Sequence, residues 1–132
     1  MKKFNSYYSS NTKKNRKNKF CLDVKKGDCC QNVSLISYPC HNGTNQKFKY
    51  NEKTKHIVAQ SSKKCLDVEK IHVIQKKCRQ TKKSQKWKRK KNQWISLANN
   101  KCMDIEGEHY HSGHIVTYPC NNGLNQTFFK KD

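Results

Sequence analysis

The stretch that decides the fold is Cys102-Met103-Asp104-Ile105, followed by Thr117-Tyr118-Pro119-Cys120 and then by Asn125-Gln126-Thr127-Phe128. Closely similar motifs occur earlier as Cys21-Leu22-Asp23-Val24, Ser37-Tyr38-Pro39-Cys40 and Asn45-Gln46-Lys47-Phe48. A degenerate copy lies between them as Cys65-Leu66-Asp67-Val68, Cys78 and Ser84-Gln85-Lys86-Trp87. Three copies of one unit in a chain of 132 residues indicate a repeat architecture.

Each repeat consists of short apolar bursts separated by turn residues, such as Phe20, Leu22 and Val24 before Gly27. Alternation over a few residues with frequent breaks predicts short β-strands. No stretch of the sequence shows the periodicity of an amphipathic helix. Because one unit alone cannot bury its apolar face, we expect three units to close around an axis as an all-β assembly.

The composition bounds the size and the partners of the protein. The chain has room for one domain, and 33% of its residues are hydrophobic. Its formal net charge is +20, from 29 basic and 9 acidic residues. A field of this strength favours polyanions such as nucleic acid, acidic polysaccharide or an anionic membrane, and does not say which of them.

Two features of the sequence disagree about the compartment. Eight cysteines in a short chain are typical of an oxidising environment. The first residues contain no apolar core of a secretory signal, and no apolar run is long enough for a transmembrane span. On that ground we expect a cytosolic protein, or a secreted one if a signal peptide has been removed.

Residues 1–19 form a basic segment without an acidic residue, in which Phe4, Tyr7 and Tyr8 are interleaved with Asn, Ser and Lys. No strand or helix period is visible there. The segment is therefore either a solvated tail or an extended arm that orders on nucleic acid, where lysines contact phosphates and aromatic rings stack on bases. We divide the chain into an unstructured arm over 1–19 and a folded domain over 20–132.

The repeats resemble the ricin B-type lectin family, whose mark is a Gln-x-Trp triplet at the end of each repeat. The corresponding triplets here are Gln46-Lys47-Phe48, Gln85-Lys86-Trp87 and Gln126-Thr127-Phe128. Phe replaces Trp in two of them and keeps an aromatic residue there. The resemblance covers residues 20–129 and implies a β-trefoil, an all-β fold of twelve strands with a six-stranded barrel and a cap of three hairpins.

The resemblance also implies one cysteine pair within each repeat, namely Cys21 with Cys40, Cys65 with Cys78, and Cys102 with Cys120. Cys29 and Cys30 are left over. A zinc site is the alternative, but zinc ligands usually come as closely spaced pairs such as Cys-x2-Cys, and the sequence has none. We expect neither a metal nor a cofactor. In a reducing compartment the thiols would act as small buried apolar side chains.

The family forms shallow sugar pockets from an Asp after the first cysteine, an aromatic residue, and an Asn before the Gln. The matching residues are Asp23, Tyr38 and Asn45 in repeat 1, and Asp104, Tyr118 and Asn125 in repeat 3. A polar partner that the family places two residues before the aromatic is replaced by Ile36 and Val116. The Asp and Asn also suit turns, so a purely structural role is the alternative.

Repeat 2 keeps Asp67, but Lys76 stands at the aromatic position and Ser84 replaces Asn, so we expect no sugar pocket there. Its charge rises instead, because residues 76–91 contain ten basic residues and no acidic one. Unpaired lysines are rarely buried, so these should lie on loops around a buried Trp87 and contact phosphates. The predicted nucleic-acid contacts are Lys2, Lys3, Lys13, Lys14, Arg16, Lys17, Lys19, Lys76, Lys77, Arg79, Lys82, Lys83, Lys88, Arg89, Lys90 and Lys91.

Two functions follow from these patterns. The preferred hypothesis is a cytoplasmic RNA-binding structural protein of the ribosome, with rRNA and neighbouring ribosomal proteins as partners. The alternative is a carbohydrate-binding lectin whose pockets in repeats 1 and 3 bind glycans, acidic ones included. No catalytic triad, paired carboxylates or P-loop stands out, so we expect no enzyme activity. His109, His111 and His114 should lie in an exposed loop.

Overall fold

The computed structural model describes residues 3–12, 18–25 and 31–131. This part of the chain contains twelve strands and four short 3-10 helices, and no α-helix. The barrel strands are β1 (Ser6–Ser10), β4 (Phe48–Asn51), β5 (His56–Ala59), β8 (Trp87–Lys90), β9 (Gln93–Ser96) and β12 (Phe129–Lys131). The hairpin strands are β2 (Lys19–Val24), β3 (Val33–Pro39), β6 (Cys65–Glu69), β7 (His72–Lys76), β10 (Cys102–Ile105) and β11 (Ile115–Tyr118). The 3-10 helices are η1 (Thr44–Gln46), η2 (Lys83–Gln85), η3 (Glu106–Glu108) and η4 (Leu124–Gln126).

The barrel closes through the aromatic residue that ends each Gln-x-aromatic triplet. The barrel strands pair as β1 with β12, β4 with β5, and β8 with β9. Between these pairs, Phe48 forms a β-bridge with Asn5, and the Trp87 N–H donates to the Lys55 carbonyl at 2.9 Å. Phe128 makes the corresponding bond in the third repeat. All three aromatic side chains are buried. The last residue of each triplet therefore joins neighbouring strand pairs of the barrel through its backbone and fills the core with its side chain.

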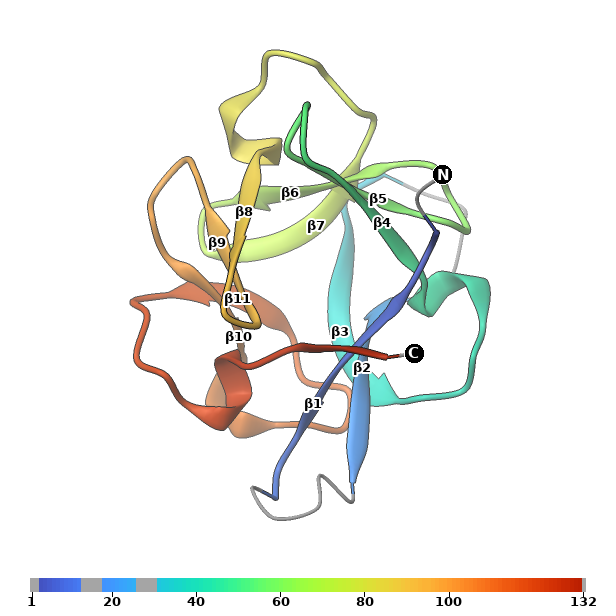
Figure 1. The fold of residues 1–132 in the computed structure, drawn as a ribbon, viewed down its shortest axis with the longest axis vertical. Coiled ribbons are helices and arrows are strands. Elements are labelled where there is room, and N and C mark those ends of the chain that lie inside the picture. Colours follow the sequence, from blue (N-terminus) through green and yellow to red (C-terminus); the bar gives the residue numbers. More distant parts are fainter. Residues whose placement is uncertain (1–2, 13–17, 26–30, 132) are drawn as a thin grey trace.

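Three hairpins, β2–β3, β6–β7 and β10–β11, make up the rest of the fold. β7 pairs with both β3 and β11, and a bridge between Ile36 and His114 joins the third side. The chain thus forms the expected β-trefoil, with three lobes around an axis (Figure 1). The threefold repetition places the Asp of each Cys-x-Asp word on the second strand of its repeat, at the same point of each lobe.

Equivalent apolar side chains from the three repeats fill the core. Leu22, Leu66 and Met103 follow the first cysteine of their repeats and are each at most 1% exposed. Full burial of a side chain of this size contributes about 1.5–3 kcal/mol. Among the described residues no helix is long and apolar enough to span a membrane.

The expectation of an unstructured arm over 1–19 is wrong for Ser6–Ser10, which form strand β1. β1 pairs with both β12 and β2, and Figure 1 shows it beside them. Its side chains are all buried: the Tyr7 ring packs edge-on against Trp94 at 5.3 Å, and the Ser9 hydroxyl donates to the Leu124 carbonyl at 2.7 Å. Polar residues satisfied by such hydrogen bonds show no apolar alternation, which is why the sequence pattern concealed the strand.

Candidate functional site

The predicted trio of repeat 1 comes together where η1 meets the end of β2. Asp23 is buried, and its Oδ1 accepts a hydrogen bond from Asn45 Nδ2 at 3.1 Å. Its Oδ2 accepts one from Gln46 Nε2 at 2.8 Å. Gln46 also donates to the Pro39 carbonyl and accepts from the His41 N–H, so it ties η1 to the end of β3. The network fixes the orientation of the carboxylate.

Repeat 3 reproduces this network at η4 and β10. Asn125 Nδ2 donates to Asp104 Oδ1 at 3.0 Å, and Gln126 Nε2 donates to Asp104 Oδ2 at 2.8 Å. Gln126 again bonds a proline carbonyl, that of Pro119, and accepts from the backbone N–H of Asn121. Two segments about twenty residues apart in sequence therefore present the same polar arrangement in both repeats.

Each carboxylate keeps acceptor capacity for a ligand. A carboxylate has roughly four lone-pair sites, and the Asn and Gln of its repeat use one on each oxygen. In repeat 1, His41 Nε2 also lies 3.6 Å from Asp23 Oδ2. Burial raises the pKa of Asp23 and of Asp104, although the amide hydrogen bonds oppose the shift. Glu106 and Glu108 raise the pKa of Asp104 further by charge repulsion. The unused acceptor sites are suited to hydroxyl donors.

An exposed tyrosine stands beside each of these carboxylates. Tyr38 pairs in register with Cys21 at the end of β3, and Tyr118 pairs with Cys102 on β11. They are 36% and 56% exposed, unusually high for such large side chains. Tyr38 lines a cavity of about 400 Å³ with Asp23, and Tyr118 lines one of about 580 Å³. Each repeat thus combines a flat ring with a fixed acceptor.

Repeat 2 differs because a lysine of the same repeat forms an ion pair with the carboxylate of Asp67. Lys82 Nζ lies 2.9 Å from Asp67 Oδ2, which also accepts from Gln85 Nε2 at 3.1 Å. Asp67 is only 1% exposed. At the aromatic position, Lys76 pairs in register with Cys65 and forms an ion pair with Glu69. The arrangement leaves no open acceptor beside a flat ring.

Other residues complete the two pockets, and the sequence reasoning had not assigned them. The repeat 1 pocket is also lined by Lys25, His41 and, from the third repeat, Ser112. The Ser112 N–H donates to the Ser37 carbonyl, which holds the third-repeat loop against β3. The repeat 3 pocket is also lined by Ile71, Lys101, Glu106 and Glu108. For Lys25 and Glu106 the signal in the sequence was their position two residues after the Asp of their repeats, whereas Ser112 and Ile71 come from a different repeat than the pocket that they line and carry no such signal.

Three disulfides join Cys21 to Cys40, Cys65 to Cys78, and Cys102 to Cys120. These are the pairs that the family resemblance implied. Each disulfide links the strand that carries the Asp to the segment that leads to the Gln. Cys29 and Cys30, the two cysteines left over, lie outside the described residues.

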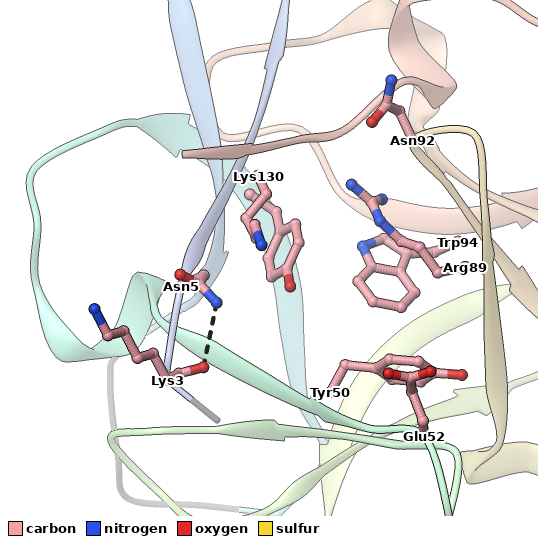
Figure 2. A pocket seen from close by; sticks show the side chains of 9 residues that line it. Lys3, Asn5, Tyr50, Glu52, Arg89, Asn92, Trp94 and Lys130 are labelled. Carbon is pink, nitrogen blue, oxygen red and sulfur yellow. Dashed lines mark hydrogen bonds between the residues drawn. The ribbon is translucent and has the colours of Figure 1, made fainter. Parts of the chain in front are cut away.

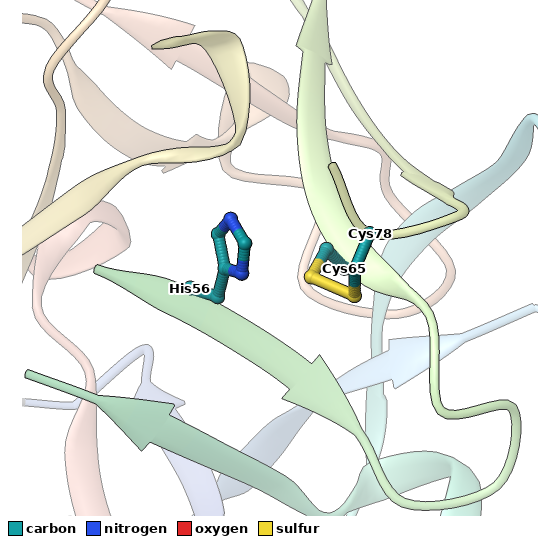
Figure 3. A group of neighbouring side chains, drawn as sticks. All are labelled: His56, Cys65 and Cys78. Carbon is teal, nitrogen blue, oxygen red and sulfur yellow. A yellow bond between two sulfur atoms is a disulfide. The ribbon is translucent and has the colours of Figure 1, made fainter. Parts of the chain in front are cut away.

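One cluster in the described part of the chain has the residue types of a metal site. His56, Cys65 and Cys78 offer ligand atoms within 4.8 Å of one another. Figure 3 shows the two sulfur atoms bonded to each other beside the imidazole. A sulfur in a disulfide is not a thiolate ligand, so the cluster offers no zinc site while the disulfide is intact. Burial, with the charge of Lys86, lowers the pKa of His56.

A further cavity of about 600 Å³ is lined by residues of the barrel strands and of the segments that flank them (Figure 2). Arg89 lies in its wall and not on an open surface. Its guanidinium is 5.1 Å from the Tyr7 ring centroid and 4.6 Å from that of Trp94, and it donates to the Phe128 carbonyl. Burial lowers the pKa of Arg89. Arg89 was predicted to contact phosphate from a loop, but the structure places it in barrel packing.

The other predicted nucleic-acid contacts are scattered over several elements. Lys76 and Lys82 are engaged in ion pairs with Glu69 and Asp67. The exposed ones in the described residues are Lys3, Lys19, Lys77, Arg79, Lys83, Lys88, Lys90 and Lys91. Those outside the described residues are Lys2, Lys13, Lys14, Arg16 and Lys17. Of the clustered histidines, His109, His111 and His114 are exposed, and His111 lies 5.1 Å from the Tyr38 ring.

Comparison with known proteins gives a consistent result. Residues 9–128 match the family described as the ricin-type beta-trefoil lectin domain. No curated protein matches the chain. Among solved structures, the C-half of an earthworm R-type lectin in complex with GalNAc superposes with a TM-score of 0.80 at 16% identity, covering 98% of both chains. The hemolytic lectin CEL-III has a TM-score of 0.78 at 26% identity, covering 96% of this chain and 30% of that one. The β-trefoil lectin of the Vibrio vulnificus hemolysin/cytolysin, with N-acetyl-D-lactosamine bound, has a TM-score of 0.77 at 19% identity, covering 98% of this chain and 93% of that one.

These findings overturn the hypothesis of an RNA-binding ribosomal protein. The matched family and the similar structures are lectins, and nothing among them points to RNA or to a ribosome. rRNA and ribosomal proteins were therefore wrong as partners. The error was to assign the charge to nucleic acid, because net charge attracts any polyanion. The match spans most of the chain, which belongs to the ricin-type β-trefoil lectin domain family.

Proposed function

We propose that this protein is a non-enzymatic lectin that binds carbohydrate in two pockets, one in repeat 1 and one in repeat 3. The observation that carries the proposal is the difference between the repeats. In repeats 1 and 3 a buried, amide-fixed carboxylate lies beside an exposed tyrosine. In repeat 2 the same carboxylate is neutralised by Lys82. A structural role alone would not require two open pockets and one filled by the chain itself.

The two pockets have the chemistry that sugar recognition needs. Asp23 and Asp104 accept hydrogen bonds from sugar hydroxyls through the acceptor sites that their amide partners leave unused. Tyr38 and Tyr118 cover the apolar face of the ring with an aromatic surface. Solved relatives hold GalNAc and N-acetyl-D-lactosamine. We therefore infer galactose-type sugars as the first ligand class to test.

The test is calorimetric titration of GalNAc and N-acetyllactosamine into wild type, Tyr38→Ala, Tyr118→Ala and the double variant. Each single variant should retain one site, and the double variant should lose affinity at least about tenfold, since an aromatic contact and its buried area contribute about 1–2 kcal/mol. Lys76→Ala is the matched control, because Lys76 occupies the tyrosine position of repeat 2. Binding by the folded double variant equal to that of wild type would rule out both pockets.

We infer that the protein works in an oxidising compartment, such as the extracellular space. Three disulfides, one in each repeat, support this location. A pull-down on immobilised galactose under oxidising and reducing conditions would check it. We expect retention on the column to fall after reduction, because each disulfide joins the strand of an Asp to the segment leading to its Gln.

A further inference from the structure

The two sugar pockets differ in charge at equivalent positions. The residue two places after the Asp is Lys25 in repeat 1 and Glu106 in repeat 3, and each lines the pocket of its repeat. The residue that follows the second cysteine is His41 in repeat 1, 3.6 Å from Asp23, and Asn121 in repeat 3. The shared scaffold therefore places a lysine in one pocket at the position where the other pocket has a glutamate.

Negative charge is concentrated at the repeat 3 pocket, although the molecule as a whole is strongly positive. The chain has only nine acidic residues at a net charge of +20. Three of them, Asp104, Glu106 and Glu108, line this one pocket, where Lys101 is the one cation among the described lining residues. Burial raises the pKa of Asp104, and the charges of Glu106 and Glu108 raise it further. Placing like charges together costs free energy, so a functional use is the simplest reason for the cluster.

The local geometry holds these acids at the pocket. Glu106 begins η3 directly after β10, and its N–H donates to the His114 carbonyl at 3.0 Å. Gly107, at φ 62°, and Glu108, at φ 58°, both adopt left-handed conformations, so the backbone of η3 turns sharply at the pocket that Tyr118 also lines. Lys25 follows β2 at the position of Glu106, and its N–H donates to Ser34 on the paired strand at 3.3 Å. The backbone is thus fixed near both charges.

We propose that the two pockets divide glycans by charge: the repeat 1 pocket prefers an anionic sugar, and the repeat 3 pocket excludes it and takes a neutral one. This inference rests on the proposed lectin function. The anionic group is either the carboxylate of a uronic acid or a sulfate ester, since the ammonium group of Lys25 can pair with both. The overall field draws anionic glycans to the whole molecule, and the pocket walls then decide where they bind.

The test uses single-pocket variants and matched sugars. Tyr118→Ala leaves the repeat 1 pocket, and Tyr38→Ala leaves the repeat 3 pocket. Each is titrated with galactose and galacturonate, which differ at C6 alone, and with GalNAc and GalNAc 6-sulfate. At low salt we expect the Tyr118→Ala variant to prefer the anionic member roughly threefold to tenfold, and the Tyr38→Ala variant to prefer the neutral member by a similar ratio. Preference for galacturonate alone or for the sulfate alone identifies the anionic group.

Reversing the charge of Lys25 or of Glu106 then tests directly whether these two residues set the preference for charged or neutral sugars. Lys25→Glu in the Tyr118→Ala background and Glu106→Lys in the Tyr38→Ala background should each reverse the preference for the charged sugar. Lys53→Glu is the control for Lys25→Glu, because Lys53 is exposed, lines neither pocket, and makes the same change of charge. Equal preferences in the two single-pocket variants, or preferences that charge reversal leaves unchanged, would overturn the proposal while the lectin function stands. Failure of both folded variants to bind any of the four sugars would overturn the lectin function and this inference with it.

Discussion

Gly43 and Gly123 each precede the 3-10 helix that presents the pocket Asn, and Lys82 stands at the same place in repeat 2. A Cβ on Gly43 would lie 2.8 Å from Asn45 Oδ1, and one on Gly123 would lie 2.8 Å from Asn125 Oδ1. A side chain there would displace the Asn. Repeat 2 has both changes together, a lysine for the glycine and a serine for the Asn, and the lysine reaches the carboxylate instead.

Replacement of that lysine should be costly. In Lys82→Met the Asp67 carboxylate stays buried without its cation, so we expect a loss of about 1–3 kcal/mol in the free energy of unfolding, measured with urea at neutral pH. Lys83→Met removes a neighbouring exposed lysine and should change stability little. Equal stability of the two variants would show that the ion pair contributes nothing.

The same pair predicts a dependence on pH. Burial alone would raise the pKa of Asp67, but hydrogen bonds to the carboxylate, that of Lys82 first and that of Gln85 among them, together with the charge of Lys82 hold it below its usual value. A depressed folded-state pKa means that the contribution is present above the unfolded pKa and is lost as pH falls through the folded pKa. The stability difference between Lys82→Met and wild type should therefore shrink in acid, and a constant difference down to about pH 2 would contradict this assignment.

The carboxylates of the two proposed sugar pockets have pKa shifts opposite in direction to that of Asp67, so sugar binding should depend on pH. The pKa of Asp23 and of Asp104 is raised by burial, so both take up a proton above the ordinary value of 3.8 and lose acceptor capacity there. A raised folded-state pKa contributes stability below the unfolded pKa, lost as pH rises through the folded pKa, so these two groups do not promote acid unfolding. Calorimetry with GalNAc measures the affinity at each pH, and tryptophan fluorescence measures whether the protein is still folded. We expect the affinity to fall on acidification at a higher pH than that at which the protein unfolds. Affinity unchanged until unfolding would contradict it.

At the scale of the element, β1 decides whether the barrel is closed. It pairs with β12, the last strand of the chain, and with β2, which carries Asp23. Its bridge partner Phe48 belongs to the closing triplet of repeat 1. Without this strand both neighbours would expose unpaired backbone edges, which favours association between chains.

A chain that lacks residues 1–10 should therefore fail to fold, because it also loses the buried Tyr7 ring against Trp94. Circular dichroism and urea unfolding measure the outcome. The control is Lys3→Ala with Lys19→Ala, which removes basic charge around β1 but keeps the strand, and which should unfold near the wild-type midpoint. A truncated chain as stable as wild type would restore the idea of a detachable arm.

At the scale of the whole molecule, the trefoil must carry a net charge of +20 on a small closed barrel. Five of the nine acids, Asp23, Asp67, Asp104, Glu106 and Glu108, lie in the buried networks or at the repeat 3 pocket, so much of the positive charge is uncompensated. Mutual repulsion of this kind destabilises the compact state and is screened by salt.

The melting temperature should rise as NaCl is increased from about 0.01 M to about 0.15 M, since the Debye length falls from about 30 Å to about 8 Å. A variant with Lys53→Glu and Lys88→Glu has its net charge lowered from +20 by two for each substitution, to +16, and should depend less on salt. A melting temperature that falls with salt in both proteins would show that attractive ion pairs outweigh repulsion.

The threefold arrangement of short strands and the recurring aromatic residues Phe48, Trp87 and Phe128 could be predicted from the sequence, and the family resemblance implied the trios Asp23–Tyr38–Asn45 and Asp104–Tyr118–Asn125. Each depends on a local word repeated at a fixed spacing, and repetition survives without knowledge of contacts. Strand β1 was not predicted because its residues are stabilised by partners far away in the sequence, as Ser9 is by Leu124, 115 residues further along the chain.

Only the tertiary structure decided what fills or lines each pocket. It brought Lys82 onto Asp67, Ser112 of the third repeat against β3, and Glu106 and Glu108 beside Tyr118. It also placed Arg89 in barrel packing, where a count of basic residues had assigned it to a phosphate. The sequence by itself determined the scaffold, because hydrophobic spacing and turns are local properties. The ligand chemistry depends on distances between segments far apart in the chain, and only the folded chain sets those distances.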